Sequence, residues 1–260
     1  MSLSVVLITK NAAPVIRRCL ESVAWADEIV VLDSESNDGT AELCREFTPQ
    51  VETVRDWPGF GPLKNRAVER ARGEWVFNID ADEWVTPALR AEIEAALGEP
   101  GDAAAFRMPR RSSYCGRFIR HSGWWPDHVT RLFRRGRARF SEDQVHERLL
   151  VEGGVGTLRQ PLLHEAFRDL EQVLAKVNAY SSQGALGLRK RGAKATVATA
   201  VAHGGWTFFR TYCLRAGFLD GREGFMLAVS NAEGTSYRYL KLLLLLEEQV
   251  RADRGRPDDL

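Results

Sequence analysis

The chain has 260 residues, of which 44% are hydrophobic and 27% are charged, and its formal net charge is +1. This length and composition are those of a globular protein that can bury an ample core. The small net charge provides no strong field for nucleic acid, and we expect no nucleic-acid partner.

Strands and helices alternate over the first hundred residues. Apolar runs predict buried strands, and apolar residues at helical spacing predict helices between them. The expected strands are 5–8, 28–32, 51–54 and 74–79, and the expected helices are 14–23, 40–47, 62–71 and 87–97. This alternation predicts an α/β fold with a doubly wound, mostly parallel sheet.

The pattern changes twice in the rest of the chain. Short β-like segments are expected at 105–108, 129–133 and 149–151. From residue 168 the spacing is helical, with a glycine-punctuated loop at 217–224 and a terminal helix at 237–246. We therefore predict one domain over residues 1–167, with halves 1–100 and 101–167, and a helical C-terminal extension over 168–260.

Polar clusters follow three of the predicted strands. They are Thr9-Lys10-Asn11, the segment from Asp33 to Asp38, and Asp80-Ala81-Asp82-Glu83. In parallel sheets, ligands bind beyond the carboxyl ends of the strands. Strand periodicity predicts that Asp80 and Asp82 point the same way, and two such oxygen ligands suit Mg²⁺ or Mn²⁺. The alternative is a solvated acidic turn that caps the following helix.

These motifs resemble those of family 2 glycosyltransferases. The resemblance is carried by 5–11, Val30-Val31-Leu32-Asp33-Ser34, Ser36-Asn37-Asp38-Gly39-Thr40, Lys64-Asn65 and 78–83. Later segments are similar to the bacterial subgroup that adds glucose or a related sugar to the lipopolysaccharide inner core. Those segments are Arg131-Leu132-Phe133-Arg134, Val145-His146-Glu147, Leu163-His164 and 217–221. The resemblance implies a GT-A fold, a nucleotide-sugar donor and a divalent metal.

The loop after the second strand is implied to bind the nucleotide. In the family an aspartate at the position of Asp33 sits against uracil, which indicates a UDP-sugar. Asp38 is a second candidate. Local turn chemistry is the alternative for Asp33, and a helix cap at Thr40 is the alternative for Asp38.

Two further segments are implied to bind the nucleotide sugar. Thr9, Lys10 and Asn11 form the loop that touches the nucleotide in the family, although Ala13 stands where many relatives carry an acidic residue. Lys64 and Asn65 follow a glycine-rich segment, and a lysine there can reach phosphate or an aspartate beside the base. A solvated helix face is the alternative.

An inverting transfer needs a base that removes the proton of the acceptor hydroxyl. The resemblance favours Glu147 as this catalytic residue, with Asp143 as the second candidate. Both are otherwise surface charges that balance nearby arginines. His164 is the candidate third metal ligand beside Asp80 and Asp82, or else a hydrogen-bonded core histidine.

The sequence thus predicts an inverting, metal-dependent glycosyltransferase. It would move a hexose, glucose foremost, from a UDP-sugar to a saccharide or glycolipid acceptor, with lipopolysaccharide core as the expected acceptor. A nucleotidyltransferase is the first alternative, but the expected glycine-rich loop bearing lysine and arginine is absent after the first strand. A non-catalytic nucleotide- or sugar-binding module is the second, disfavoured by the acidic pair and the candidate bases.

The expected location is the cytoplasm, because the sequence shows neither a signal peptide nor an apolar run long enough for a transmembrane helix. A basic cluster at 189–194, followed by Trp206, Phe208 and Phe209, suggests a peripheral contact with the cytoplasmic face of the inner membrane. The alternative is a helix packed on the catalytic domain.

Overall fold

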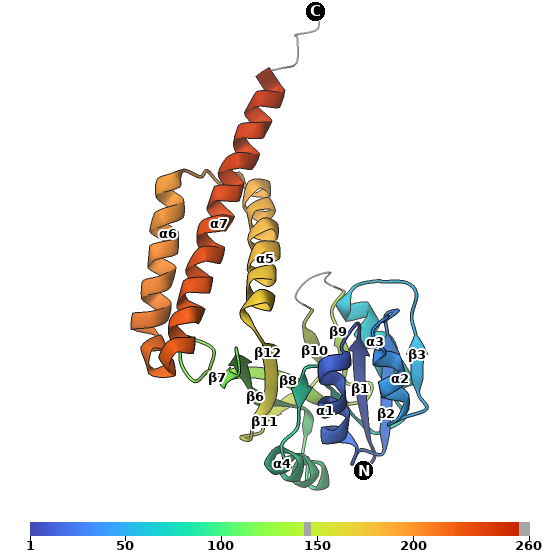
Figure 1. Cartoon of the computed structure of the whole chain (residues 1–260). Coiled ribbons are helices and arrows are strands. Elements are labelled where there is room, and N and C mark those ends of the chain that lie inside the picture. Colours follow the sequence, from blue (N-terminus) through green and yellow to red (C-terminus); the bar gives the residue numbers. More distant parts are fainter. Residues whose placement is uncertain (143–146, 255–260) are drawn as a thin grey trace, which may run out of the picture. The chain divides into compact units, whose positions relative to one another are not determined.

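The computed structural model describes residues 1–142 and 147–254. Contacts divide the chain into two units. Figure 1 shows the whole chain, coloured by residue number from the N-terminus to the C-terminus. The first, here called the sheet unit, comprises Met1–Arg111 and Pro126–Glu165. The second, the helical unit, comprises Ser112–Trp125 and Ala166–Leu260, so that a short internal segment joins the C-terminal helices.

The first half of the sheet is parallel. β1 (Leu3–Thr9) lies between β2 (Glu28–Asp33) and β4 (Trp75–Asn78), and β3 (Val51–Thr53) pairs with β2. Four helices accompany these strands: α1 (Ala13–Val23), α2 (Thr40–Arg45), α3 (Phe60–Arg70) and α4 (Pro87–Gly98). Val5 of β1 is buried in one core with residues of α1 and α4, and Val6 in another with residues of α3. Helices therefore cover both faces, which confirms the doubly wound α/β arrangement.

The second half of the sheet is mostly antiparallel. β8 (Asp127–Arg134) pairs antiparallel with both β4 and β6 (Ala103–Tyr114). The order continues through β12 (Leu162–Phe167) to β5 (Glu83–Trp84), and β11 (Gly154–Thr157) pairs parallel with β6. A separate ribbon pairs β9 (Ala138–Phe140) with β10 (Leu149–Val151). The parallel half ends in loops from β1, β2 and β4, and these loops carry the polar clusters noted in the sequence.

In the helical unit, the longest helix packs against the other two. α7 (Gly221–Arg254) contacts both α5 (Leu170–Lys190) and α6 (Val197–Phe209), between which Figure 1 draws it. Asp169 caps α5, and Thr196 caps α6 through a capping box. A π-helical turn η1 (Arg210–Leu214), a 3₁₀ turn η2 (Gly217–Asp220) and β7 (Arg117–Phe118) complete the described elements. No helix in the described part of the chain is long and apolar enough to cross a membrane.

The C-terminal expectations need two corrections. The terminal helix starts at Gly221 and not near residue 237, so the expected loop at 217–224 is a 3₁₀ turn followed directly by the first turn of α7. The glycines there serve close packing as well as turning. A Cβ on Gly224 would lie 1.9 Å from the carbonyl oxygen of Gly217, which only glycine permits. The repeated glycines at 217–224 indicated a loop, whereas in the structure they allow the 3₁₀ turn η2 and the first turn of α7 to pack closely.

Candidate functional site

The ends of β1 and β2 hold buried polar groups side by side. Thr9 pairs with Asp33 in the sheet register. The Asp33 carboxylate, in a residue that is 1% exposed, accepts hydrogen bonds from the backbone N–H and the hydroxyl of Ser36. The hydroxyls of Thr9 and Ser34 are buried and find no partner among the described residues. Buried hydroxyls are usually hydrogen-bonded, so these two are available to a ligand.

Asp38 and Asn11 join the two loops that follow these strands. Asp38 accepts hydrogen bonds from the backbone N–H of Ala13 at 3.1 Å and from both the N–H and the hydroxyl of Thr40. The hydrogen bond from the Thr40 hydroxyl is the main cause that lowers the pKa of Asp38. Asn11 accepts from Asn37 N–H at 3.0 Å. Asp38 thus orders the start of α2, and the neighbouring Lys10 side chain is exposed.

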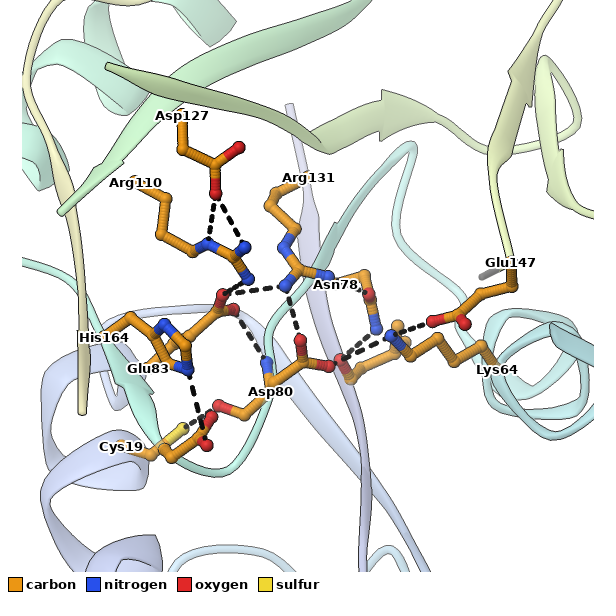
Figure 2. A network of polar contacts seen from close by, with 12 residues as sticks. Cys19, Lys64, Asn78, Asp80, Glu83, Arg110, Asp127, Arg131, Glu147 and His164 are labelled. Carbon is orange, nitrogen blue, oxygen red and sulfur yellow. Dashed lines mark hydrogen bonds and ion pairs between the residues drawn. The ribbon is translucent and has the colours of Figure 1, made fainter. Parts of the chain in front are cut away.

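A network of ion pairs extends from the end of β4 (Figure 2). Arg131, on β8, donates to Asp80 at 2.5 Å, to Glu83 at 2.7 Å and to the Asn78 side chain at 3.1 Å. Glu83 is fully buried and also accepts from the backbone N–H of Asp80 at 3.0 Å. Arg110 reaches Glu83 and pairs with Asp127. A buried carboxylate needs such partners, so Arg131 and Arg110 make the burial of Glu83 possible.

The charges in this network hold one another ionised. Desolvation alone raises the pKa of Asp80, but the positive charges of Arg131 and Lys64 outweigh it and hold this pKa well below its usual range. Desolvation likewise opposes the charge of Arg131, yet Asp80 and Glu83 raise the pKa of its guanidinium. Asp80 therefore stays a carboxylate at neutral pH, with one oxygen toward each cation.

Lys64 joins Asp80 to the candidate base. Its ammonium group, on a side chain that is 5% exposed, lies 3.0 Å from Asp80 Oδ1 and 2.9 Å from Glu147 Oε1. Oε2 of Glu147 forms no hydrogen bond with the described residues, and the Glu147 side chain is 18% exposed. One oxygen of Glu147 is thus fixed by Lys64, and the other is left to accept a proton.

Asn65, the next residue on α3, connects this helix to the end of β9. Its amide donates to the Phe140 carbonyl at 2.9 Å and accepts from the Phe140 N–H at 2.8 Å. A Cβ on Gly61 would lie 1.9 Å from the Ser141 carbonyl oxygen. Asn65 and Gly61 therefore fix Phe140 and Ser141 against α3, and both the nitrogen and the oxygen of the Asn65 amide take part in that contact.

Asp80 and Asp82 follow the end of β4 and do not continue it, so strand periodicity does not determine their directions. β4 ends at Asn78, and the chain then turns, with Glu83 N–H donating to the Asp80 carbonyl at 3.0 Å. Ala81 lies in this turn and is half-buried. The Asp82 carboxylate, 38% exposed, lies 3.5 Å from Nε2 of His164.

Asp82 and His164 form a partial donor set for a divalent metal. A separation of 3.5 Å suits two ligands of one ion, because metal–ligand bonds are about 2.1 Å long. Carboxylate oxygen and imidazole nitrogen together suit Mn²⁺ better than Mg²⁺. Asp80 is held by its two cations instead, and no group of three or more His, Cys, Asp or Glu side chains in the described ranges could hold a metal ion.

Most of the predicted site residues lie at this one edge of the sheet unit. Asp143, the second candidate base, falls outside the described residues. The sequence reasoning missed Arg131 and Arg110 as members of the site. A signal was present, because Arg131 directly precedes the apolar pair Leu132-Phe133 in the expected β-segment at 129–133, and an arginine inside a buried strand needs an anionic partner.

The chain belongs to glycosyltransferase family 2. The family model described as "Glycosyl transferase family 2" matches residues 4–162. The chain is also 32% identical to the lipopolysaccharide core biosynthesis glycosyltransferase LpsC of Rhizobium meliloti, over 100% of this chain and 97% of that protein. The protein is therefore a glycosyltransferase, and its doubly wound mixed sheet is of the GT-A type.

Other similar proteins span the same length. An uncharacterized glycosyltransferase of Rickettsia bellii is 30% identical over 99% of this chain and 91% of that protein. Among solved structures, residues 1–349 of S. aureus TarS in complex with UDP match with a TM-score of 0.48 and 15% identity, over 100% of this chain and 94% of that one.

Proposed function

We propose that the protein is an inverting, metal-dependent glycosyltransferase that moves a hexose, glucose foremost, from a UDP-sugar to a saccharide acceptor. The observation that carries the proposal is the position of Lys64 between Asp80 and Glu147. One ammonium group thereby links the end of β4, where a donor diphosphate would bind, to a carboxylate with a free oxygen, where an acceptor hydroxyl would approach.

The donor would bind along the ends of β1, β2 and β4. Asp33 is the proposed partner of the uracil base, and the unpaired hydroxyls of Thr9 and Ser34 lie beside it. Lys10, Asn11 and Asp38 would border the nucleotide from the two connected loops. Lys64 would supply positive charge near the donor phosphates, where negative charge develops in the transition state.

Asp82 and His164 are the residues proposed to hold Mg²⁺ or Mn²⁺, with Asp80 beside them. A divalent ion bound there would stabilise the negative charge on the departing diphosphate. Asp80, fixed between Lys64 and Arg131, would then set the position of the turn that carries Asp82.

Glu147 is the proposed general base. The oxygen of the acceptor hydroxyl forms a bond to the anomeric carbon while the bond from that carbon to the diphosphate oxygen breaks. The electron pair of the broken bond leaves with UDP, and the hydroxyl proton passes to Oε2 of Glu147. Attack from the face opposite the leaving group inverts the anomeric configuration. Lys64 keeps Oε1 in place, so that Oε2 has one orientation.

The proposed acceptor is a saccharide of the lipopolysaccharide core. Support comes from the similarity to LpsC, which extends over the whole chain and includes the helical unit. Such an acceptor is a glycolipid. The proposal therefore includes a peripheral contact of the protein with a membrane surface.

A membrane contact would use the end of the helical unit formed by η1 and η2. Exposed apolar side chains gather there, with Leu214, Phe218 and Leu219 each more than half exposed and Arg210 and Arg215 on the same segment. Aromatic and basic side chains together favour the membrane interface. The basic cluster at 189–194 begins in the last turn of α5 and ends before α6, whereas Trp206 and Phe209 lie in the last turn of α6 (Figure 1).

Replacing Glu147 tests the proposed function. In Glu147→Gln the side chain keeps its shape but cannot accept the proton, so turnover with UDP-glucose and a core oligosaccharide acceptor should fall by about a hundredfold to ten-thousandfold. Titration calorimetry should show UDP affinity within about threefold of the native value, because Asp33 and the metal hold the donor independently.

Glu152→Gln is the matched control, since Glu152 is an exposed glutamate in the same half of the sheet unit, and its turnover should stay native. Asp143→Asn compares the second candidate. Normal turnover in Glu147→Gln with an inactive Asp143→Asn would exchange the two assignments. No transfer from any UDP-hexose by the native protein, with Mg²⁺ or Mn²⁺ present, would refute the glycosyl-transfer proposal itself.

A further inference from the structure

The helical unit contains a cavity of about 490 Å³ that is lined by none of the residues assigned to the donor, the metal or the general base. It lies over α7, with α5 on one side and the end of α6 on the other, and the segment at Ser122–Trp124 borders it. The α7 residues that line the cavity include the small residues Ser230 and Gly234. Ligand sites of small molecules are typically clefts of roughly 300–1,000 Å³, and helix bundles place them between helices.

The cavity is lined by four cations and by no acidic residue of the described chain. Lys176, Arg210, Arg215 and Arg238 all border it. The three arginines form no ion pair with any carboxylate in the described ranges. Arg66, Arg70 and Arg131 in the sheet unit are, by contrast, paired with acids.

Shape, and not charge, positions two of these arginines. A Cβ on Gly123 would lie 2.2 Å from Nη1 of Arg215, and a Cβ on Gly184 would lie 2.7 Å from Nε of Arg238. Each guanidinium group therefore rests against a glycine backbone, with its donors left for another partner. Arginine donors in this arrangement match the oxygens of a phosphate or carboxylate.

Unused polar groups accompany the cations. The hydroxyl of Ser122 is buried, in a residue that is 2% exposed, and has no hydrogen-bond partner among the described residues. The side-chain amide of Asn231, on α7, also forms no hydrogen bond within them. A buried hydroxyl without a partner costs free energy unless a ligand or water satisfies it.

The segment that carries Ser122 is held in place by the glycine-rich motif at 217–221. Asp220 accepts hydrogen bonds from the N–H groups of Arg120 and His121 at 3.0 and 2.9 Å. A Cβ on Gly217 would lie 2.8 Å from the Ser122 hydroxyl. Ser122 itself has φ 59°, a left-handed conformation that is strained for a serine. The motif at 217–221 therefore supports the segment that borders this cavity, although its own residues do not line the cavity.

Aromatic rings complete the cavity. Trp124 stacks on Phe167 with ring centroids 6.2 Å apart, and Tyr180, which is 59% exposed, borders the opposite side from α5. An aromatic ring provides an apolar face on which the C–H face of a sugar can pack, while hydroxyl and amide groups bind sugar hydroxyls.

We propose that this cavity binds a sugar that carries a phosphate or carboxylate group, and that this sugar is part of the acceptor. The arginines contact the anionic group, Ser122 and Asn231 contact hydroxyls, and Trp124 or Tyr180 packs on the ring. The assignment to the acceptor rests on the proposed function, whereas the binding itself does not require it.

Titration calorimetry on the full chain without donor tests the binding. Glucose 6-phosphate is the probe, with glucuronate as the carboxylate analogue and with glucose and inorganic phosphate as single-group controls. We expect binding of at least one of the anionic sugars, at least tenfold tighter than either control. In the double variant Arg215→Gln/Arg238→Gln this affinity should fall at least tenfold, and in Arg191→Gln, an exposed arginine outside the cavity, it should not change.

Tyr180→Ala gives a second test that leaves every charge in place. This substitution should weaken the binding of the sugar phosphate but not the binding of inorganic phosphate. Absence of binding by both anionic sugars, equal affinity for inorganic phosphate and glucose 6-phosphate, or native affinity in a folded double variant would each overturn the proposal.

If transfer proceeds but the anionic sugars do not bind, only this inference fails. If they bind but no UDP-hexose supports transfer, the proposed function and the acceptor assignment fail, and the cavity remains a sugar-phosphate site.

Discussion

One arginine of the sheet unit and two of the helical unit are in opposite electrostatic situations. Arg131 in the sheet unit is buried and bound to two carboxylates, whereas Arg215 and Arg238 in the helical unit border a cavity and have no acidic partner among the described residues. A buried, fully paired charge contributes mainly by fixing the position of its neighbours. An unpaired, hydrated charge contributes little to the fold and keeps its donors for a ligand. The two kinds of arginine should therefore respond differently to the same substitution.

The largest expected effect is on stability, from Arg131→Met. Removing this guanidinium leaves the fully buried Glu83 with Arg110 as its remaining cation, and breaking a buried pair in this way costs about 3–5 kcal/mol. Chemical denaturation of the variant should show a loss of unfolding free energy in this range.

Arg238→Met is the matched substitution in the helical unit. Because Arg238 is exposed and has no ion pair among the described residues, its unfolding free energy should change by less than about 0.5 kcal/mol. Equal losses in both variants would mean that the paired and unpaired arginines contribute alike, and the comparison would fail.

The second effect is on activity, and it sharpens the contrast between the fixed Asp80 and the more exposed Asp82. Asp82→Ala should lower turnover at least about a hundredfold, since the metal that Asp82 would hold stabilises the leaving diphosphate by several kcal/mol. The unfolding free energy should change little, because the side chain is 38% exposed. Asp102→Ala, in an exposed turn, is the control and should keep native turnover. Full activity of Asp82→Ala, or of the native enzyme in excess EDTA, would contradict the metal assignment.

The smallest effect concerns a paired carboxylate away from the site. Glu28 accepts hydrogen bonds from Ser4, Gln50 and Arg72. Burial by itself raises the pKa of Glu28, but these hydrogen bonds outweigh it and lower this pKa to about 2. A carboxyl group whose pKa is lower in the folded state than in the unfolded state stabilises the fold at pH values above its unfolded-state pKa. That contribution is lost as the pH falls from about 4.5 toward 2.

Native protein should therefore lose about 1–2 kcal/mol more unfolding free energy than Glu28→Gln between pH 6 and pH 3. Denaturation curves at the two pH values measure this difference. Parallel pH profiles for the two proteins would show that Glu28 has the same pKa in the folded and unfolded states.

The sheet unit was largely predictable from sequence because its elements are local. The apolar run at 5–8 and the helical spacing at 14–23 match β1 and α1 within one or two residues. The motifs also identified the edge where the polar residues gather, since strand ends can be read from short windows. Which charged side chains pair with one another could not be predicted from these local patterns. That Lys64 bridges Asp80 and Glu147 depends on the path of the chain between them, which no local pattern encodes.

The helical unit shows the complementary failure. Residues 237–246 were expected to form the terminal helix because their apolar run is dense, yet α7 begins at Gly221. Glycine has low helix propensity, and tertiary contacts decided the outcome there: Gly224 packs against the Gly217 carbonyl. The cavity was invisible for the same reason, since Ser122 and Arg238 come together only when a β-hairpin segment joins the helices.

The contacts of Lys64 and Asn65 also bear on how the enzyme forms. Two adjacent residues of α3 bind partners that lie 83 and 75 positions further along the chain. Contacts of such separation require closure of long loops, and they form slowly compared with helices and hairpins. We therefore expect the candidate base to reach its place late in folding, after the parallel strands and their helices have assembled. A newly made chain would then acquire its nucleotide site before it acquires the means to catalyse transfer.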